Sequence, residues 1–180
     1  MYGILNNIVN WDFEMKDPGF FELPETGRVF RGWRKVGHGK VNMHKAFLVS
    51  SNTYFFSLAY QADIKELSNH LFSLGFGQKV CKDCYDEDQA LVPTPEWKYS
   101  VMNAGWVKGD TVNLGIGQGY LLATPMQLAN YASLLAKKGI SSEPSIVTFE
   151  NTKKSLKIWQ DDKFDDSDWN KMHQALLGVI

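Results

Sequence analysis

The sequence predicts an α+β fold that is mainly helical and carries a few short strands. Apolar residues recur at helical spacing over residues 41–76, and residues 124–139 carry helix-capping signals at both ends. Residues 1–40 are rich in glycine, proline and aromatic residues, which is typical of loops with short extended pieces. The 180 residues, 44% of them hydrophobic, suffice for about one domain with a sizeable core.

Three helices are expected in the first helical region, over 42–49, 53–61 and 64–74. The third has the clearest boundaries. Asp63 is placed to cap its N-terminus, and Glu66 at the third helical position is placed to complete a capping box. Gly75 is placed to end it.

Residues 77–110, with PTPEW inside, are expected to be loop-like, and a capped helix follows them. Thr124 is its N-cap, Pro125 occupies the first helical position and Gln127 completes a second capping box, while Gly139 is the C′ residue. Apolar spacing predicts one buried face for this helix, made of Leu128, Tyr131, Ala132, Leu135 and Ala136.

The C-terminal part is expected to contain two strands and one helix. PSIVTF (144–149) and SLKIWQ (155–160) are predicted to be extended, and WNKMHQALLGVI (169–180) to be an amphipathic helix. The acidic run DDKFDDSD (161–168) is interpreted as a solvated turn in preference to a set of metal carboxylates, because no histidine lies at suitable spacing.

Composition excludes several classes of function. A formal net charge of −1 with no basic cluster argues against nucleic acid as a partner and against a membrane surface. No apolar run reaches the roughly 20 residues of a membrane span, and the N-terminus lacks the features of a signal peptide. The pair Cys81 and Cys84 lacks further zinc ligands and the context of a thioredoxin motif, so a local disulfide and two free thiols remain.

The stretch SSNTYFF interrupts an apolar region with Ser50, Ser51 and Asn52. Such residues commonly cap a helix, because their side-chain oxygens accept from free backbone amides. The same triplet has the pattern S-x-N, which is a weak signal by itself. Four scattered histidines at 38, 44, 70 and 173 are expected to have structural roles.

Two longer segments give the triplet its context. GHGKVNMHKAFLVSSNTYFFSLAYQADI (37–64) and GDTVNLGIGQGYLLATPMQLANYASLLAKKG (109–139) resemble the transpeptidase domain of class B penicillin-binding proteins, of the penicillin-binding protein 2 type. DPGFFELPETGRVFRGWRKVGHG (17–39) resembles the segment that precedes them. The resemblance is strong from Asp17 to Gly139 and weaker in the first 16 residues and in the tail.

This resemblance implies an antiparallel sheet flanked by helices and joined to a helical lobe, with this chain supplying mostly the lobe. The family uses three motifs, S-x-x-K, S-x-N and K-[ST]-G. Ser50 and Asn52 match the second one. There the serine relays a proton, and the asparagine holds the S-x-x-K lysine and a substrate carbonyl.

The other two motifs do not occur in the sequence. The expectation is therefore a partial transpeptidase domain over 1–180, truncated at both ends, with a loop-rich segment (1–40), a helical lobe (41–139) and the start of a return toward the sheet (140–180). Without the nucleophilic serine, this chain alone is predicted neither to cross-link peptidoglycan nor to bind penicillin covalently.

Some relatives hold a zinc ion near this region through carboxylates, a histidine and the middle residue of S-x-N. Asp17 and His38 match two of these ligands, whereas Gly32 and Ser51 stand at the other two positions. A metal is therefore not expected, and neither is any other cofactor.

The function implied is that of a peptidoglycan D,D-transpeptidase on the periplasmic face of the bacterial inner membrane, although this sequence carries no signal or transmembrane segment. Its substrates would be stem peptides ending in D-Ala-D-Ala, its inhibitors β-lactams, and its partner a membrane glycosyltransferase. The alternative is a non-catalytic scaffold or binding module of the cell wall. A serine β-lactamase shares the fold but fits GQGYLLATP poorly.

Overall fold

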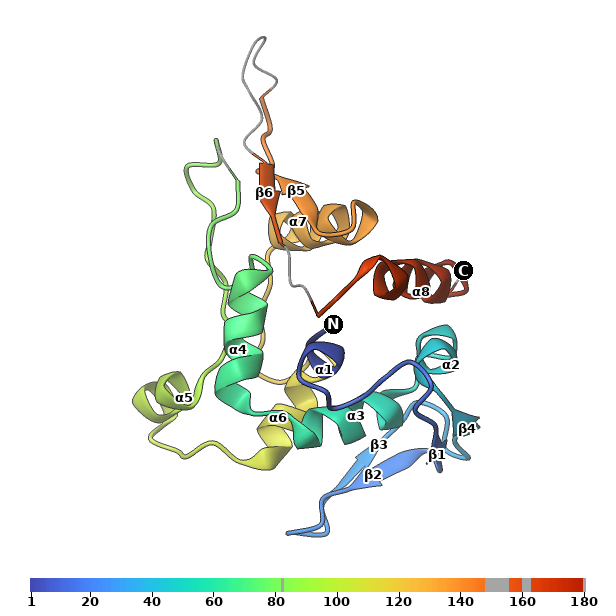
Figure 1. Ribbon diagram of the computed structural model, residues 1–180. Coiled ribbons are helices and arrows are strands. Elements are labelled where there is room, and N and C mark those ends of the chain that lie inside the picture. The colour runs from blue at the N-terminus through green and yellow to red at the C-terminus, as the bar shows by residue number, and fades with distance from the viewer. Residues whose placement is uncertain (82, 148–155, 160–162, 180) are drawn as a thin grey trace.

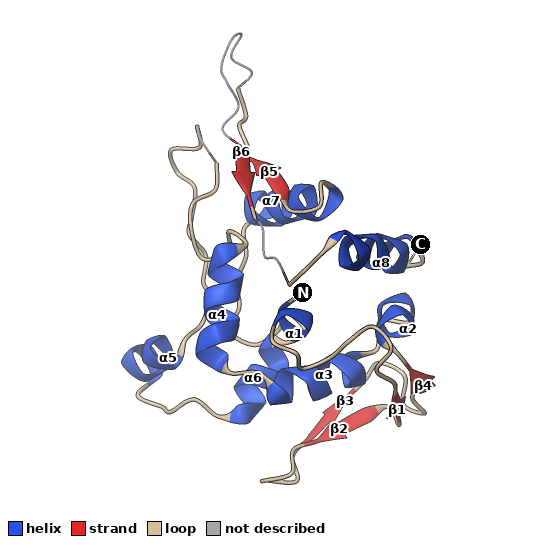
Figure 2. Ribbon diagram, viewed as in Figure 1, coloured by secondary structure: helices blue, strands red, loops and turns tan. Residues whose placement is uncertain are grey.

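A computed structural model describes residues 1–81, 83–147, 156–159 and 163–179, which form eight helices and six short strands (Figures 1 and 2). This confirms the mainly helical α+β fold. The helices are α1 (Tyr2–Leu5), α2 (Met43–Leu48), α3 (Asn52–Gln61), α4 (Ile64–Ser73), α5 (Pro95–Met102), α6 (Lys108–Leu114), α7 (Pro125–Ala136) and α8 (Asp166–Leu177). The strands are β1 (Met15–Asp17), β2 (Phe20–Glu22), β3 (Val29–Arg31), β4 (Gly39–Val41), β5 (Ile140–Ser142) and β6 (Leu156–Ile158).

The strands of the described residues pair two by two in antiparallel fashion, as β1–β4, β2–β3 and β5–β6. Asp17 lies opposite Gly39 in the first pair, and Phe21 lies opposite Phe30 in the second. Strands β1, β2 and β3 contact α3, so the N-terminal strands lie beside the helix that follows Ser50 and Ser51 (Figure 1).

The main core joins the N-terminal segment, α2, α3 and the C-terminal helix. Tyr54 and Ala46 are completely buried in it, and Trp169 of α8 is almost completely buried. Helix α8 contacts α2, and α6 contacts α3. Full burial of a large apolar side chain contributes about 1.5–3 kcal/mol, so these contacts stabilise the packing of α2, α3 and α8.

The two strongest helix-start predictions hold in the structure. Asp63 accepts from the amides of Lys65 and Glu66, and Thr124 and Gln127 form the reciprocal capping box at α7. The second half of the Asp63 box was predicted wrongly. The Glu66 carboxylate accepts a hydrogen bond from the Tyr2 hydroxyl instead.

Helix α5 was missed, because residues 77–110 were expected to be loop-like. Thr94 caps this helix and Pro95 occupies its first turn. Lys98 of α5 is buried and forms an ion pair with Asp110 of α6 at 2.6 Å. Asp110 also accepts from the Val107 amide, which ties α5 to the start of α6.

The predicted buried face of α7 is wrong in part. Leu128, Ala132 and Ala136 are exposed. Gln127 and Asn130 are buried instead, and the Gln127 amide donates to the backbone carbonyls of Gln78 and Gln89. A polar side chain with buried partners takes a core position that apolar spacing alone does not reveal.

The tail differs from its prediction in two places. The first strand is β5 at 140–142, whereas 144–147 form no strand and 148–149 lie outside the described residues; β6 falls within the predicted 155–160. Part of the acidic run caps α8, since Asp165 accepts from the Asp168 amide. Residues 161–162 of that run also lie outside the described residues.

Cys81 and Cys84 form a disulfide, which selects one of the two remaining readings of this pair. The Asp83 carboxylate accepts from the Ser145 hydroxyl and from the amides of Ile146 and Val147, so the disulfide loop is joined to the segment after β5. None of the described helices has the length and apolar content needed to cross a membrane.

Candidate functional site at the Ser50–Asn52 turn

The turn between α2 and α3 is a Schellman motif with a serine at its left-handed position. The Ser50 amide donates to the Phe47 carbonyl at 3.1 Å, and the Ser51 amide donates to the Ala46 carbonyl at 2.9 Å. Ser50 has a φ of 50°. This position usually carries glycine, because a β-carbon there costs about 1–2 kcal/mol. Ser50 is one of five described non-glycine residues with positive φ, so any role for it has to be argued from its surroundings.

The four residues of this turn alternate between outside and inside. Ser50 is exposed and Asn52 is half-buried, whereas Ser51 and Thr53 are each 1% exposed. Ser51 caps α3 by accepting from the Tyr54 amide at 3.3 Å. The predicted helix cap is therefore present, and it is supplied by the middle residue of the motif. Ser50 and Asn52 make no side-chain hydrogen bond among the described residues, so both polar groups remain open to a ligand.

Beneath the turn, Ser51 joins a buried carboxylate. The Ser51 hydroxyl donates to Oδ2 of Asp17 at 2.6 Å, and His38 Nδ1 lies 2.8 Å from the same oxygen. Asp17 Oδ1 accepts from the Gly19 amide at 2.7 Å. Burial pushes the pKa of Asp17 upward, but the bonds from Ser51, His38 and Gly19 outweigh it and hold the pKa below its ordinary value. Asp17 is therefore ionised at neutral pH, and His38 Nδ1 is the donor.

Two glycines allow the Asp17 turn and the loop before His38 to approach each other. A β-carbon on Gly19 would lie 2.4 Å from the Lys35 carbonyl oxygen, and one on Gly37 would lie 2.1 Å from the Asp17 carbonyl oxygen. Both glycines have positive φ, of 91° and 69°. Only glycine combines these conformations with such close backbone contact. The DPG and GHG motifs therefore bring Asp17 beside His38.

Trp33 contacts the same turn from outside. Its indole N–H lies 3.1 Å from the carbonyl oxygens of both Val49 and Ser50, and its ring lies 5.3 Å from the ring of His38. The Trp33 side chain is 66% exposed, so it places an aromatic surface next to Ser50. No local sequence signal predicts this contact, because Trp33 and Ser50 are 17 residues apart.

The residues around Asp17 do not fit a zinc ion. Zinc in proteins is bound by Cys, His, Asp and Glu side chains, and only Asp17 and His38 of the four positions carry one. Ser51 has a hydroxyl, which donates to Asp17 Oδ2 at 2.6 Å. Gly32 offers no side chain at the remaining position, and a β-carbon there would lie 3.3 Å from Thr53 Oγ1. His38 Nε2 is buried without a partner in the described part of the chain, but it lies on the ring edge opposite Asp17.

Elsewhere the described residues hold one cluster with metal-binding residue types, Cys81, Asp83 and Cys84. Its cysteines are joined in the disulfide and are not available as thiolate ligands.

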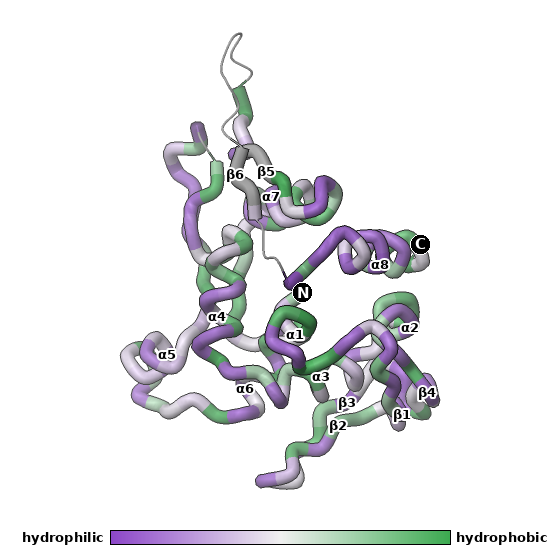
Figure 3. Tube along the Cα trace, viewed as in Figure 1, coloured by the Kyte–Doolittle hydropathy of each residue, from purple (hydrophilic) through white to green (hydrophobic). Residues whose placement is uncertain are grey.

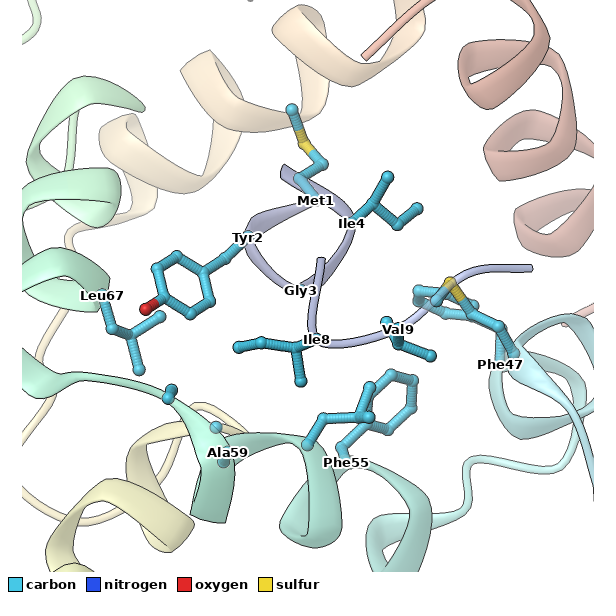
Figure 4. A pocket seen from close by; sticks show the side chains of 14 residues that line it. Met1, Tyr2, Gly3, Ile4, Ile8, Val9, Phe47, Phe55, Ala59 and Leu67 are labelled. Atoms are coloured by element: carbon cyan, nitrogen blue, oxygen red, sulfur yellow. The ribbon is translucent and has the colours of Figure 1, made fainter. Parts of the chain in front are cut away.

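An apolar pocket of about 140 Å³ lies between α1 and α3 (Figure 4). Ile4, Val9, Phe55 and Ala59 are among its lining residues, and the tube of α1 is green, which marks hydrophobic residues, in Figure 3. Neither Ser50 nor Asn52 lines this pocket. The pocket therefore belongs to the packing of the N-terminal segment and is separate from the turn.

The helical lobe, the short strands and the S-x-N turn are the features that the family resemblance implies. Residues 1–179 match the family model described as the penicillin binding protein transpeptidase domain, and the chain belongs to this family. The match includes the first 16 residues and the tail, where the resemblance was expected to be weaker.

Within the family, the chain is most informatively compared with three proteins. It is 39% identical to the peptidoglycan D,D-transpeptidase MrdA of Acinetobacter baumannii over 186 residues, covering 100% of this chain and 28% of that protein. It superposes on crystalline PBP2 of Pseudomonas aeruginosa in complex with WCK 5153 with a TM-score of 0.85, at 33% identity, covering 97% of this chain and 40% of that one.

The third protein is PBP2 of Helicobacter pylori, solved in complex with MreC. The TM-score is 0.81 at 32% identity, and the match covers 98% of this chain and 32% of that one. The chain thus spans about a third of the length of these relatives.

Proposed function

We propose that this chain carries the S-x-N element of a serine-type peptidoglycan D,D-transpeptidase, with Ser50 and Asn52 as its site residues. The observation that carries the proposal is the left-handed, exposed Ser50, held above a buried Asp17–His38–Ser51 cluster in a chain of the transpeptidase family. The proposal assigns residues 1–180 to one transpeptidase domain, with 41–139 as its helical lobe.

The chemistry proposed is acyl transfer. A serine of an S-x-x-K motif attacks the carbonyl between the two terminal D-alanines, the C–N bond breaks, and D-alanine leaves with a proton. The amine of a second stem peptide then displaces the serine oxygen from the acyl-enzyme. Ser50 has a hydroxyl that both donates and accepts, so it suits relay of the leaving-group proton. Asn52 carries an amide oxygen for a lysine ammonium and an amide N–H₂ for a substrate carbonyl.

The sequence contains neither S-x-x-K nor K-[ST]-G, so the reaction is proposed for a protein in which this chain is joined to both motifs. β-Lactams are its expected inhibitors. Its proposed place is the periplasmic face of the inner membrane, with a membrane glycosyltransferase as partner. An MreC-like protein is a further candidate partner, since MreC is bound in the Helicobacter pylori structure.

The test begins with the DNA on both sides of this coding segment. In-frame S-x-x-K upstream and K-[ST]-G downstream are expected, and stop codons or unrelated sequence there would favour the non-catalytic scaffold instead. The product of the complete reading frame should then be labelled covalently by a fluorescent penicillin.

Replacing Ser50 with alanine is expected to slow this labelling by about 10²–10⁴-fold, the usual contribution of a general acid–base group. Ser100→Ala removes an exposed hydroxyl of α5, and it should leave the rate unchanged. Normal labelling of the Ser50→Ala protein would contradict the relay role.

A further inference from the structure

Four side chains from separate segments hold the Ser50 turn, and we name them the turn clamp: Asp17, Trp33, His38 and Ser51. Trp33 donates to the Ser50 carbonyl from the outer side. Ser51 donates to Asp17 on the buried side, and His38 contacts both Asp17 and Trp33. The contacts form one connected path from the exposed indole to the buried carboxylate.

Ser51 connects this path to both helices. Its hydroxyl accepts from the Tyr54 amide to start α3 and donates to Asp17 at the same time. Its amide closes the end of α2 on the Ala46 carbonyl. A single buried residue therefore sets the end of one helix, the start of the next and the distance between the turn and Asp17.

The clamp contacts add to the backbone hydrogen bonds that hold Ser50 in a conformation it does not favour. The left-handed position is unfavourable for a residue with a β-carbon. A hydrogen bond to a charged partner is among the stronger kinds, so the bond between Ser51 and Asp17 helps to offset this cost.

We propose that the turn clamp is a metal-free positioning device that fixes the backbone of Ser50 and thereby the direction of its hydroxyl. Asp17, Trp33 and His38 are positioning residues in it, since none of them is the group assigned to the reaction. The conformational part of the proposal stands on the contacts alone, whereas its catalytic consequence rests on the proposed function of Ser50.

The conformational test uses the 180-residue chain labelled with ¹⁵N and ¹³C. The ¹³Cα and ¹³Cβ shifts and the amide coupling of Ser50 report its φ, and the indole proton of Trp33 reports the outer contact. Trp33→Phe keeps an aromatic ring beside His38 but removes the indole donor. Because Trp33 is largely exposed, this variant is expected to fold. The signals of Ser50 should move away from the left-handed values.

Ser51→Ala removes the buried hydroxyl that binds Asp17, and Ser68→Ala is its matched control. Ser68 is also 1% exposed and also donates one side-chain hydrogen bond, to the Pro93 carbonyl at 2.9 Å, but it lies in α4. Both variants should lower the unfolding temperature. Only Ser51→Ala should shift Ser50 and speed exchange of the Trp33 indole proton by about tenfold or more. Unchanged Ser50 signals in both Trp33→Phe and Ser51→Ala, or equal shifts in Ser68→Ala, would overturn the clamp.

The metal-free part is tested by dialysing the chain against zinc and measuring bound metal. Substoichiometric zinc is expected, with Ser50 signals unchanged by a chelator. One zinc per chain, lost in both Asp17→Ala and His38→Ala, would overturn this part.

The catalytic consequence is tested in the complete gene product with fluorescent penicillin. Trp33→Phe should slow acylation about tenfold or more with little change in unfolding temperature, as expected when a catalytic group is misplaced. Acylation at the wild-type rate together with shifted Ser50 signals would show that the clamp does not serve the reaction. Failure of the wild-type protein to label would instead contradict the proposed function and leave the conformational result standing.

Discussion

The ends of α2 and α7 have the same backbone geometry and different surroundings. Each is a Schellman motif whose left-handed residue is not glycine, with Ser50 at φ 50° and Lys138 at φ 52°. In α7 the Lys138 amide donates to Leu135 at 3.3 Å and the Gly139 amide donates to Leu134 at 2.8 Å, which repeats the pattern of Ser50 and Ser51. Helix α7 therefore ends one residue before the predicted position, because Lys138 is the C′ residue and Gly139 follows it.

The two helix ends differ in the residue that follows the left-handed position. After α2 it is Ser51, which has extended backbone, is buried and is bonded to Asp17. After α7 it is Gly139, which has a φ of 89° and passes directly into β5. Lys138 itself forms an exposed ion pair with Asp166 at 3.6 Å. One motif reverses the chain into a strand, whereas the other presents a serine hydroxyl above a buried carboxylate.

The largest effect is expected from Gly139→Ser. This variant places a serine after the left-handed residue at the end of α7, as Ser51 follows Ser50 at the end of α2. In Gly139→Ser the new β-carbon would lie 2.3 Å from the Trp159 carbonyl oxygen, at a φ that disfavours side chains. The overlap and the strained φ together should lower the free energy of unfolding by about 3 kcal/mol. Urea denaturation measures the effect. A loss below about 0.5 kcal/mol would mean that the close approach at Gly139 is not required.

How far the sequence predicts these regions depends on how local their signals are. The start of α7 was predicted because Thr124, Pro125 and Gln127 lie within four positions. The same Thr-Pro pair starts α5 at Thr94 and Pro95, but it lies inside a segment that was expected to be loop-like.

The turn clamp was not predictable in this way. Asp17 and Ser51 are 34 residues apart, and Trp33 and Ser50 are 17 apart. The family resemblance placed Asp17, His38 and Ser51 at related positions, yet it described them as an incomplete metal site. Only the distances show that a hydrogen-bonded cluster stands there. The contact joins a turn that requires glycine to a helix start far along the chain. Neither apolar periodicity nor a capping rule predicts such a contact.

An intermediate effect is expected from the buried carboxylate that distinguishes the α2 end. Asp17→Asn removes a charged acceptor from two side-chain hydrogen bonds and should cost about 2 kcal/mol at neutral pH. At the α7 end, Asp166→Asn removes an exposed partner of Lys138 and should cost less than about 0.5 kcal/mol. Equal losses in the two variants would contradict the distinction.

The same carboxylate sets a pH dependence. The folded-state pKa of Asp17 is held below its ordinary value, so the unfolded chain binds more protons as the pH falls. The stability that Asp17 contributes is complete above the unfolded-state pKa of about 3.9 and is lost as the pH falls through the lower folded-state value. Wild-type protein should therefore lose stability more steeply than Asp17→Asn below about pH 4. If stability falls equally steeply in the two proteins, the hydrogen-bond partners of Asp17 do not lower its pKa.

The smallest expected effect separates the two ends most sharply. Glycine relieves the left-handed strain at either position, so Ser50→Gly and Lys138→Gly should each raise the free energy of unfolding by roughly 0.5–1 kcal/mol, after allowing for the more flexible unfolded chain.

In the complete gene product the two variants should differ in their rates of acylation. Lys138→Gly should acylate with penicillin as fast as wild type, whereas Ser50→Gly should be as slow as Ser50→Ala. We expect Ser50→Gly to gain stability and lose acylation, and Lys138→Gly to gain stability without that loss. This pattern is expected where a residue is retained for function although glycine would suit the backbone conformation better. If Ser50→Gly is destabilised instead, the strain assigned to this turn is absent, and the clamp has nothing to hold in place.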